Sequence, residues 1–427
     1  MNPKVLIISP YFAPSNAADT HRIRMSLPYF AQNGWDAEVV IVNQQHSDLM
    51  KDELLKQSIP AGIKIHEVSA FNKKWTAKFG LGSLALRSMW FYKQKVDQLL
   101  KAQKYELIYF STTQFPLCIL GAYWKKRFGI PYVIDMQDPW HSDYYQDKPK
   151  NQRPAKYWFS YRLNKYLEPL AMKHVDGLIS VSAAYLSVLQ KRYPRIARIP
   201  SAVITFGVLE ADFVIAKSNK HQFKELLNPG KVNIVCVGRG GADMQKPVSL
   251  VFETLQKGLQ EEPGLFNQLH FYFIGTSYAP SGQGLPTILP IATKYQVQDH
   301  VTEITDRISF YHTLLSLQQA DALFIPGSDD PQYTASKIYP YLLSKKPLLA
   351  IFHQDSNAID VINECSTNTT LIKFSDEDSN SKLSRVLTDW ANMSLVPLQL
   401  TPQIKKYSAT HLTLRQTELF NRAIHQR

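Results

Sequence analysis

Arg239 lies in a glycine-rich turn that is suited to binding a phosphate. The turn, GRGG at 238–241, follows the apolar run VNIVCV at 232–237, and Lys246 comes shortly after it. The free backbone amides of such a turn and the forked guanidinium of an arginine both bind phosphate oxygens. The glycine spacing differs from the dinucleotide-binding pattern, and no acidic residue follows at the expected distance. The alternative interpretation is a tight turn without a ligand.

A second segment with polar groups starts at Ser328 and Asp329. It follows the apolar run at 321–326 and leads through a Ser/Thr-rich turn into a helical pattern at 336–344. In a parallel sheet the loop after such a strand lies at the carboxyl edge, where these folds bind ligands. Ser336 can cap the helix, whose free amides then face the loop beside Lys337. The alternative is a further strand-helix unit with a solvated acidic turn.

Asp138 and His141 follow a third apolar run. The strand pattern PYVIDM at 131–136 continues directly into QDPWH at 137–141. A strand that ends in an acid, a proline and a tryptophan places polar groups at the carboxyl edge of its sheet. The alternative is that Asp138 caps the next helix.

The turn after the first strand carries Asn16 and, slightly later, Arg22. It reads PSNAA at 14–18, where alanine has a Cβ and does not replace glycine at positive φ without strain. Arg22 is our candidate for an anion contact, and Asn16 is a second candidate binding residue at this turn. The alternative for Arg22 is a solvated surface residue in the first helical turn.

Strand and helix patterns alternate throughout both halves of the chain, and these elements position the candidate residues. With 427 residues the chain is too long for one ordinary core, and it suits two domains. The alternation predicts an α/β fold with two doubly wound sheets that face a cleft.

The excess of positive charge lies entirely in the first half of the chain. The net charge is +12; residues 1–200 hold 28 Lys and Arg against 15 Asp and Glu, whereas residues 201–427 hold 20 against 21. Between 71 and 105, lysines alternate with Trp, Phe and Leu, and Asp97 is the only acid there. This pattern is typical of a helix at an anionic membrane surface, and a helix predicted over 153–173 has a similar aromatic composition. The alternative is that the apolar residues pack on their own sheet.

The cysteines and the apolar segments indicate the cellular compartment of the protein. The three cysteines, Cys118, Cys236 and Cys365, are far apart and match no metal spacing, which fits buried thiols in a reducing compartment. The first residues read as a strand and not as a signal peptide, and no window has the length of a membrane span. We therefore expect a cytoplasmic protein, either free or peripheral on the inner face of the cell membrane.

The segment from 323 to 352 resembles the donor-site segment of GT-B glycosyltransferases, in particular the retaining group called family four. Members of that family carry a Glu, seven residues and a second Glu, followed by a helix and a proline-led strand. Aligned on Pro347, these two positions are Gln332 and Pro340, so neither acid is present. The helix SKIYPY at 336–341 and the proline-led strand remain. Asp329 or Asp330 could supply the missing carboxylate.

The resemblance implies roles for the candidate residues. Arg239, Lys246 and Lys337 would bind the donor pyrophosphate, and Arg307 would lie near the nucleotide base. On the acceptor side, the run at 135–141 is similar to an Asp-x-Arg-Asp-Pro-Trp pattern of the family, with Gln in place of Arg at 137. This makes Asp138 the first and His141 the second candidate for the polar group that faces the sugar acceptor.

The resemblance also implies a domain arrangement. We expect an acceptor-side Rossmann-like domain over 1–205 and a donor-binding Rossmann-like domain over 206–400. A final helix over 401–427 is expected to return to the first domain.

Three functions are compatible with these features. The first is a metal-independent glycosyltransferase that moves a sugar from a nucleotide-diphosphate donor to a glycan or lipid-pyrophosphate acceptor, without a further cofactor, in the synthesis of cell-surface polysaccharide. The second is an inactive sugar-nucleotide or glycan-binding member of a glycan-assembly complex, which the missing glutamates favour. The third, nucleic-acid binding, rests on charge alone, and no recognition helix or aromatic RNA motif accompanies that charge. We do not expect a nucleic-acid partner.

Overall fold

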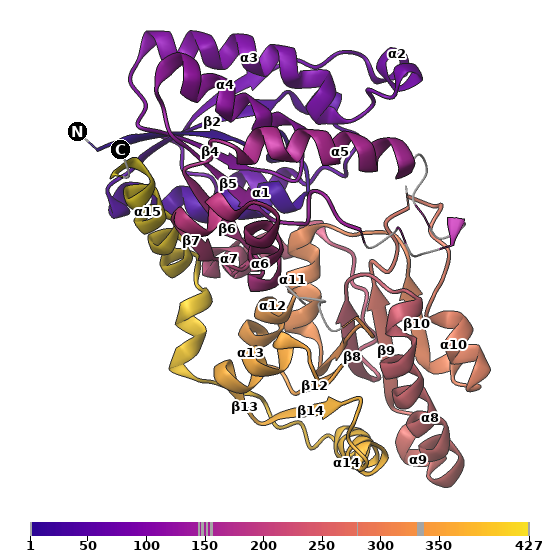
Figure 1. The fold of residues 1–427 in the computed structure, drawn as a ribbon. Helices are drawn as coiled ribbons and strands as arrows, with labels where there is room; N and C mark the ends of the chain where they lie inside the picture. The colour runs from indigo at the N-terminus through magenta and orange to yellow at the C-terminus, as the bar shows by residue number, and fades with distance from the viewer. Residues whose placement is uncertain are drawn as a thin grey trace. The chain divides into compact units, whose positions relative to one another are not determined.

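The chain forms two compact units, each built around a parallel sheet. The structure is a computed structural model that describes residues 2–143, 146, 149–150, 153, 157–279, 281–330 and 337–425. The first unit contains Met1–Phe206 and Ala409–Arg427, and the second contains Gly207–Ser408 (Figure 1). The division falls within two residues of the expected boundary at 205, and the expected third segment is split, since only residues from 409 onward are part of the first unit.

The sheet of the first unit is parallel with the strand order β3-β2-β1-β4-β5-β6-β7. Apolar runs form its central strands, which are buried on both faces as parallel strands usually are. The order reverses between β1 and β4, so the loops that follow these two strands lie side by side. The strands are β1 (Lys4–Ile8), β2 (Asp36–Val42), β3 (Lys64–Val68), β4 (Leu107–Ser111), β5 (Tyr132–Met136), β6 (Gly177–Ser180) and β7 (Ser201–Val203).

Helices cover both faces of this sheet. One face packs against a core that α3, α4, α5 and α6 share with the strands, and α1 lies with α15 on the other face. The helices are α1 (Ala18–Ser26), α2 (Lys73–Thr76), α3 (Leu84–Ala102), α4 (Ile119–Phe128), α5 (Tyr157–Met172), α6 (Ala183–Arg192) and α15 (Ala409–His425).

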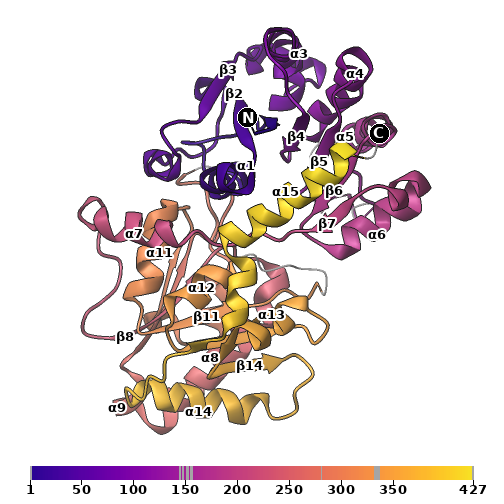
Figure 2. The same ribbon diagram turned by 90° about the vertical axis from the view of Figure 1, so that its left-hand side faces the viewer.

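The C-terminal helix α15 completes the first unit. It packs along α1, β5 and β6, as Figure 2 shows. Phe420 of α15 contacts the rings of Phe30, Trp35 and Tyr109, and Leu419 lies against Gly177. The apolar face of the C-terminal helix therefore packs on the first unit.

The second unit repeats the same winding. Its main sheet has the order β10-β9-β8-β11-β12-β14, again fully parallel, and the order reverses between β8 and β11. Short strands β13 (Ser366–Thr367) and β15 (Gln399–Leu400) form a separate antiparallel pair. The main strands are β8 (Val232–Val237), β9 (Leu269–Ile274), β10 (Val301–Ile304), β11 (Ala322–Pro326), β12 (Leu348–Phe352) and β14 (Thr369–Lys373).

The helices of the second unit lie on the two faces of that sheet. One core joins α8, α9, α10 and α14 to the sheet, and a second core joins α11, α12 and α13 to its other face. The helices are α7 (Glu210–Ser218), α8 (Gln245–Glu261), α9 (Pro263–Phe266), α10 (Leu289–Lys294), α11 (Phe310–Gln319), α12 (Ile338–Ser344), α13 (Asn357–Cys365) and α14 (Ser379–Ala391).

The predicted α/β fold class is confirmed, and the strands predicted at 131–136, 232–237 and 321–326 agree with β5, β8 and β11 within one residue. Helix α1 ends at Ser26, and two 3-10 turns at Leu27–Tyr29 and Ala31–Asn33 follow. Pro28 explains the break, because it has no amide hydrogen to continue the helix. Helices α7, α8, α9, α10 and α13 were not predicted. All three cysteines are buried and unpaired.

Candidate functional site

The loops after β8 and β11 meet at the point where the strand order of the second sheet reverses. Arg239, in the loop after β8, donates two hydrogen bonds to Asp243, with Nη1 2.9 Å from Oδ1 and Nη2 2.6 Å from Oδ2. Ser328, in the loop after β11, donates from Oγ to Oδ2 of the same carboxylate over 2.7 Å. Asp243 therefore connects the two predicted donor-site segments.

Asp243 was not among the predicted residues. Its backbone carbonyl also accepts the amide of Asp329 over 2.9 Å. Partial burial alone would raise the pKa of Asp243, but the hydrogen bonds from Arg239 and Ser328 lower it below its ordinary value. The i, i+4 spacing from Arg239 on a turn that enters a helix is the signal that would have identified it.

Lys337 places a cation against the glycine-rich turn. Its Nζ is buried and has no hydrogen-bond partner among the described residues. A Cβ built on Gly238 would lie 3.4 Å from this Nζ, and Gly238 has φ +126°, a conformation that favours glycine. The Tyr341 hydroxyl accepts the amide of Val237 and donates to its carbonyl over 3.1 Å, which holds α12 on the end of β8.

Lys246 and Arg307 do not join this group. Lys246 is the second residue of α8, and its Nζ lies 4.7 Å from the ring centre of Phe374, the residue after β14. Arg307 follows β10 and lies over Tyr278, with 4.4 Å from its guanidinium carbon to the ring centre. Arg239 and Lys337 are therefore the cations that the structure brings to the strand-order reversal, and Lys246 is directed elsewhere.

The acidic turn after β11 is only partly described. Asp329 and Asp330 are exposed, whereas Ser328 is buried and its Oγ accepts the Asp330 amide over 3.1 Å. Helix α12 begins at Ile338 after Lys337, and no side-chain cap bond is formed there. The predictions for Gln332 and Ser336 concern positions outside the described residues.

In the first unit, Arg22 has a different environment from the one predicted. Its side chain is buried, and its Nε lies 2.8 Å from Oδ2 of Asp135. Its two terminal nitrogens donate to the carbonyls of Ile204 and Thr205 over 2.7 and 2.8 Å. The cation is thus paired inside the fold, so we no longer assign it an anion contact. It anchors the end of the first unit to β5.

Asn16 is held at the start of α1 by a short hydrogen-bond chain. Its Oδ1 lies 2.8 Å from His21 Nε2, and Arg24 Nε lies 3.2 Å from His21 Nδ1. An arginine only donates, so His21 carries its proton on Nε2 and donates it to Asn16. Ala17 has φ −128°, so the turn avoids the strain that alanine would bring at positive φ.

Asp19 is a buried acid at the strand-order reversal of the first sheet, and it was not predicted as a site residue. Its two carboxylate oxygens accept hydrogen bonds from the hydroxyls of Thr112 and Thr113, over 2.7 and 2.8 Å, and from the Thr113 amide. Burial raises the pKa of Asp19 to about 6, although these hydrogen bonds oppose the increase. A carboxyl that titrates near neutrality at such an edge is a candidate functional group.

Asp138 and His141 lie after β5 in different environments. Asp138 is open to solvent on one side, while the protein packed around its other sides raises the pKa of its carboxyl. Burial and the neighbouring Arg192 lower the pKa of His141, so the ring is neutral near pH 7. Glu168 accepts the His141 amide over 3.1 Å, and Arg192 donates to the His141 carbonyl over 3.1 Å. These two contacts fix the backbone of the segment.

Comparison with protein families gives one match. Residues 27–208 match the model of the Glycosyltransferase Family 4. The match covers most of the first unit and includes the run at 135–141. The resemblance seen in the sequence is confirmed over this region, and no curated protein matches the chain.

Solved structures extend the likeness to the whole chain. A sucrose-phosphate synthase from Thermosynechococcus elongatus is 13% identical and superposes with a TM-score of 0.59, covering 98% of both chains. Anabaena HepE in complex with UDP-glucose is 16% identical with a TM-score of 0.53, covering 98% of this chain and 95% of that one. The fold is that of the GT-B glycosyltransferases. WaaG, a glycosyltransferase involved in lipopolysaccharide biosynthesis, is 14% identical with a TM-score of 0.52, covering 98% and 97%.

Proposed function

We propose that the protein is a glycosyltransferase that transfers a sugar from a nucleoside-diphosphate donor. The observation that carries this proposal is Lys337, whose buried Nζ has no acceptor among the described residues and lies against the glycine-rich turn. A buried cation without a partner is costly, and an anionic ligand removes that cost. The phosphate-binding features of the turn and the likeness to GT-B enzymes support a diphosphate as this anion.

The chemistry follows from where charge develops. When the bond between the sugar C1 and the diphosphate oxygen breaks, negative charge accumulates on the leaving diphosphate, and Lys337 stabilises it. Arg239 adds positive charge beside it, partly offset by its carboxylate partner Asp243. We propose that these groups supply the charge that a metal ion supplies in other enzymes, so that transfer is metal-independent. The acceptor hydroxyl forms the new bond to C1 and gives up its proton. Asp138, an open carboxylate with a raised pKa, is our candidate to accept it.

The donor and the stereochemistry are proposed from the resemblance. UDP-glucose is present in the HepE structure, which supports a UDP-sugar as the first donor to test. Similarity to family four supports retention of the anomeric configuration. Asp330 and Asp329 remain candidates for the carboxylate that the family places beside the sugar.

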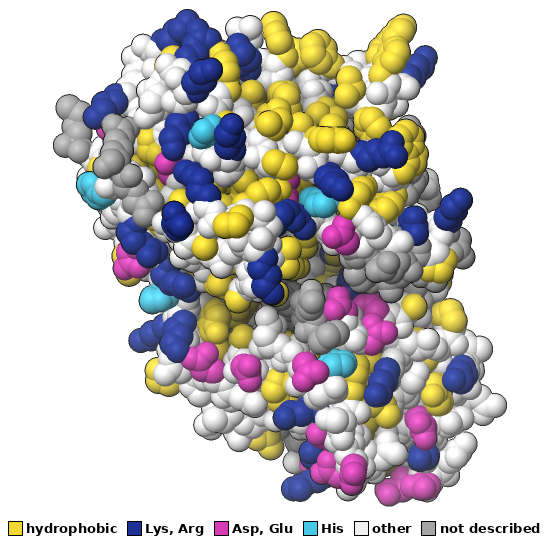
Figure 3. Space-filling model, in the orientation of Figure 1, with side chains coloured by type: hydrophobic (Ala, Val, Ile, Leu, Met, Phe, Trp, Pro, Cys, Tyr) yellow, Lys and Arg dark blue, Asp and Glu magenta, His cyan; other side chains and the backbone are white. Residues whose placement is uncertain are grey.

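The acceptor is proposed to be a lipid-linked glycan or a glycan of a cell-surface polysaccharide. Figure 3 shows hydrophobic side chains together with Lys and Arg over the part of the first unit where Figure 1 places α2, α3 and α5. Such a surface suits peripheral contact with an anionic membrane. In the part of the chain that the structure describes, no helix has the length and apolar composition to cross a membrane.

The test is binding and turnover of UDP- and GDP-sugars by the purified protein. Calorimetry should show saturable binding of one donor, and release of the nucleoside diphosphate should increase when a membrane-lipid extract is added as acceptor. Lys337→Ala and Arg239→Ala should lose both binding and release. Lys257→Ala, which removes an exposed lysine paired with Glu253 on α8, is the matched control and should behave like the wild type. Failure of every donor to bind would overturn the proposal.

A second candidate is a protein that binds the donor without transferring the sugar. Pro340, in the first turn of α12, occupies the position at which the resembled family carries its second glutamate. A proline has no group that can act on the sugar. Saturable donor binding without product from any donor and acceptor pair would favour this function over the enzyme.

A further inference from the structure

A pocket of about 370 Å³ opens on the first unit where α5, the 3-10 turn before α3 and the segment after β4 meet. Its volume lies in the range of roughly 300–1,000 Å³ that is usual for small-molecule sites. Phe159 forms part of the wall, and a Cβ on Gly80 would lie 3.1 Å from its ring. All of the residues that line the pocket belong to the first unit.

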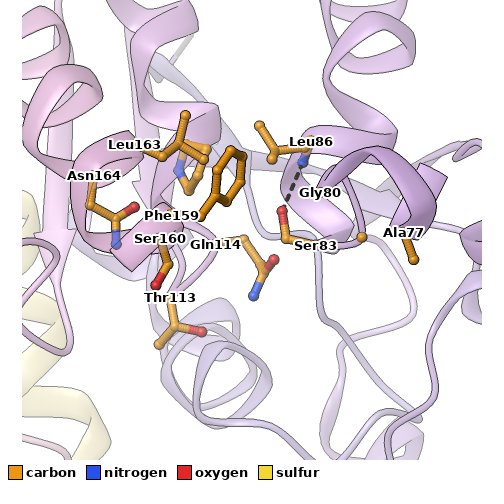
Figure 4. Close-up of a pocket in the computed structure, with 12 residues that line it drawn as sticks. Ala77, Gly80, Ser83, Leu86, Thr113, Gln114, Phe159, Ser160, Leu163 and Asn164 are labelled. Carbon is orange, nitrogen blue, oxygen red and sulfur yellow. Dashed lines mark hydrogen bonds between the residues drawn. The ribbon is translucent and has the colours of Figure 1, made fainter. Parts of the chain in front are cut away.

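The walls of this pocket differ in polarity. Figure 4 shows Leu86, Phe159 and Leu163 on one side, with Thr113, Gln114 and Ser160 on the other. The three apolar side chains are only half-buried, so apolar surface remains exposed in the hollow. A pocket of this kind suits a ligand with a hydrocarbon part and a polar end.

The polar wall is connected to both candidate segments of the first unit. Thr113 donates its hydroxyl and its amide to Asp19, as described above. Asn164, which also lines the pocket, accepts the indole N–H of Trp140 over 3.1 Å. Trp140 lies two residues after Asp138 and stacks on Phe115, with 5.6 Å between the ring centres. One lining residue, Asn164, is therefore in direct contact with the segment proposed to face the acceptor.

Exposed aromatic side chains and lysines are close in sequence to the residues that line the pocket. Trp75, Phe79 and Trp158 have exposed fractions of 70%, 76% and 66%, and each lies within two residues of a lining residue. Lys73 and Lys74 of α2 and Lys78 of the following 3-10 turn are exposed. Lys73 pairs with Asp48, and Lys78 lies over the Trp75 ring. Aromatic rings with neighbouring cations match a hydrocarbon that carries an anionic head group. Arg87 is not one of these available cations, because it is buried and its guanidinium donates to the Phe71 and His46 carbonyls.

We propose that this pocket binds the hydrocarbon chain of a lipid-phosphate acceptor, next to its phosphate. The inference rests on the proposed function and deepens it, because it makes the acceptor lipid-linked and gives its anchor a place in the first unit. The chain lies against Leu86, Phe159 and Leu163, and the phosphate lies toward the exposed lysines of α2 and the following turn. The glycan part then extends past Asn164 toward Asp138.

The experiment fills the pocket from two walls. Ser160→Phe on α5 and Ala77→Phe on the turn before α3 each place a ring in the hollow, and Val188→Phe adds the same ring at an exposed position of α6 as the control. Binding of farnesyl phosphate, with inorganic phosphate and farnesol as separate probes, is followed by tryptophan fluorescence. We expect one saturable site for farnesyl phosphate in the wild type and in Val188→Phe, and at least tenfold weaker binding in both pocket variants. Thermal midpoints of all variants are measured alongside.

The outcomes separate this inference from the proposed function. Equal farnesyl phosphate affinity in folded wild type and both pocket variants would overturn the pocket assignment, whether or not a nucleotide sugar binds. Saturable, pocket-dependent binding would support it even if no donor were turned over. Co-sedimentation with phosphatidylglycerol vesicles tests the other source of a hydrocarbon chain. If the pocket variants lose vesicle binding while the wild type does not bind farnesyl phosphate, the occupant is bulk phospholipid and the acceptor assignment is wrong.

Discussion

Arg22 and Asp135 form an ion pair inside the first unit, with Arg22 Nε 2.8 Å from Asp135 Oδ2 and both side chains almost completely buried. Tyr109 donates its hydroxyl to the same carboxylate oxygen over 2.9 Å. Burial raises the pKa of Asp135, and the charge and hydrogen bonds of Arg22 and Tyr109 oppose that increase. The pair joins α1 to β5, and Arg22 also donates hydrogen bonds to the carbonyls of Ile204 and Thr205 near the end of the unit's first segment. Its role is therefore structural.

Replacing Arg22 by Met is expected to lower the free energy of unfolding of the first unit by about 3–5 kcal/mol, because the Asp135 carboxylate is left buried without its cation. Urea unfolding followed by circular dichroism measures the change. The double variant Arg22→Met with Asp135→Leu should be less destabilised than the sum of the single variants. Lys56→Met removes the exposed partner of Glu53 and should cost less than about 1 kcal/mol. An Arg22 variant as stable as this control would contradict the structural role.

The contrast between the strands and Arg22 shows what the sequence could predict. Runs such as KVLII at 4–8 and VNIVCV at 232–237 are mainly apolar, and this local property predicted the parallel strands and the order of elements. The burial of Arg22 depends on Asp135, far along the chain, and local composition contains no information about that partner. Helix α8 was missed because the glycine-rich turn and Pro247 precede its periodic part, where proline is tolerated in the first turn.

In the candidate site, too, the sequence predicts which residues lie at the edge of the sheet but not where their side chains point. Glycine and cations in the loops after β8 and β11 identified Arg239, Ser328 and Lys337, since the carboxyl edge of a parallel sheet follows from strand patterns alone. Side-chain direction does not follow from them. Lys246 was grouped with these residues by its position in the chain, and its contact with Phe374 shows that its side chain points to another strand.

Asp19 predicts a pH dependence of stability. Burial raises its pKa from 3.8 to about 6, so the native state holds this proton at pH values where the unfolded chain has lost it. The resulting stabilisation is complete below about pH 4 and is lost as the pH rises to about 6, by roughly 3 kcal/mol at most. Asp19→Asn removes the titrating group, so the unfolding free energy of the variant should fall less than that of the wild type across this interval. Urea midpoints at pH 4 to 7 provide the measurement. Parallel curves would show that Asp19 ionises as it does in the unfolded chain.

Gly238 predicts a local effect on the second unit. Alanine at φ +126° is strained, and its Cβ would lie 3.3 Å from Lys337 Cδ. We expect Gly238→Ala to lower the unfolding free energy by about 1–3 kcal/mol and to displace the Lys337 side chain. Gly264→Ala is the matched control, since a Cβ there meets nothing within 4 Å and no positive φ is involved. Thermal midpoints compare the two, and an equally stable pair would show that the turn adopts another conformation.

Lys337 and Lys246 predict different effects on ligand affinity, although the sequence assigned both to the donor diphosphate. Lys337 lies against the glycine-rich turn with no partner among the described residues, whereas Lys246 is exposed and leans on Phe374. A hydrogen bond to a charged group contributes roughly 1.5–3 kcal/mol, so Lys337→Met should weaken binding of a nucleoside diphosphate by about tenfold to a hundredfold. Lys246→Met should change it by less than about threefold. Calorimetry at several salt concentrations measures both, because loss of a buried contact persists at high salt while loss of an exposed charge is screened. If the two variants weakened binding equally and only at low salt, long-range charge and not a built phosphate site would explain the affinity.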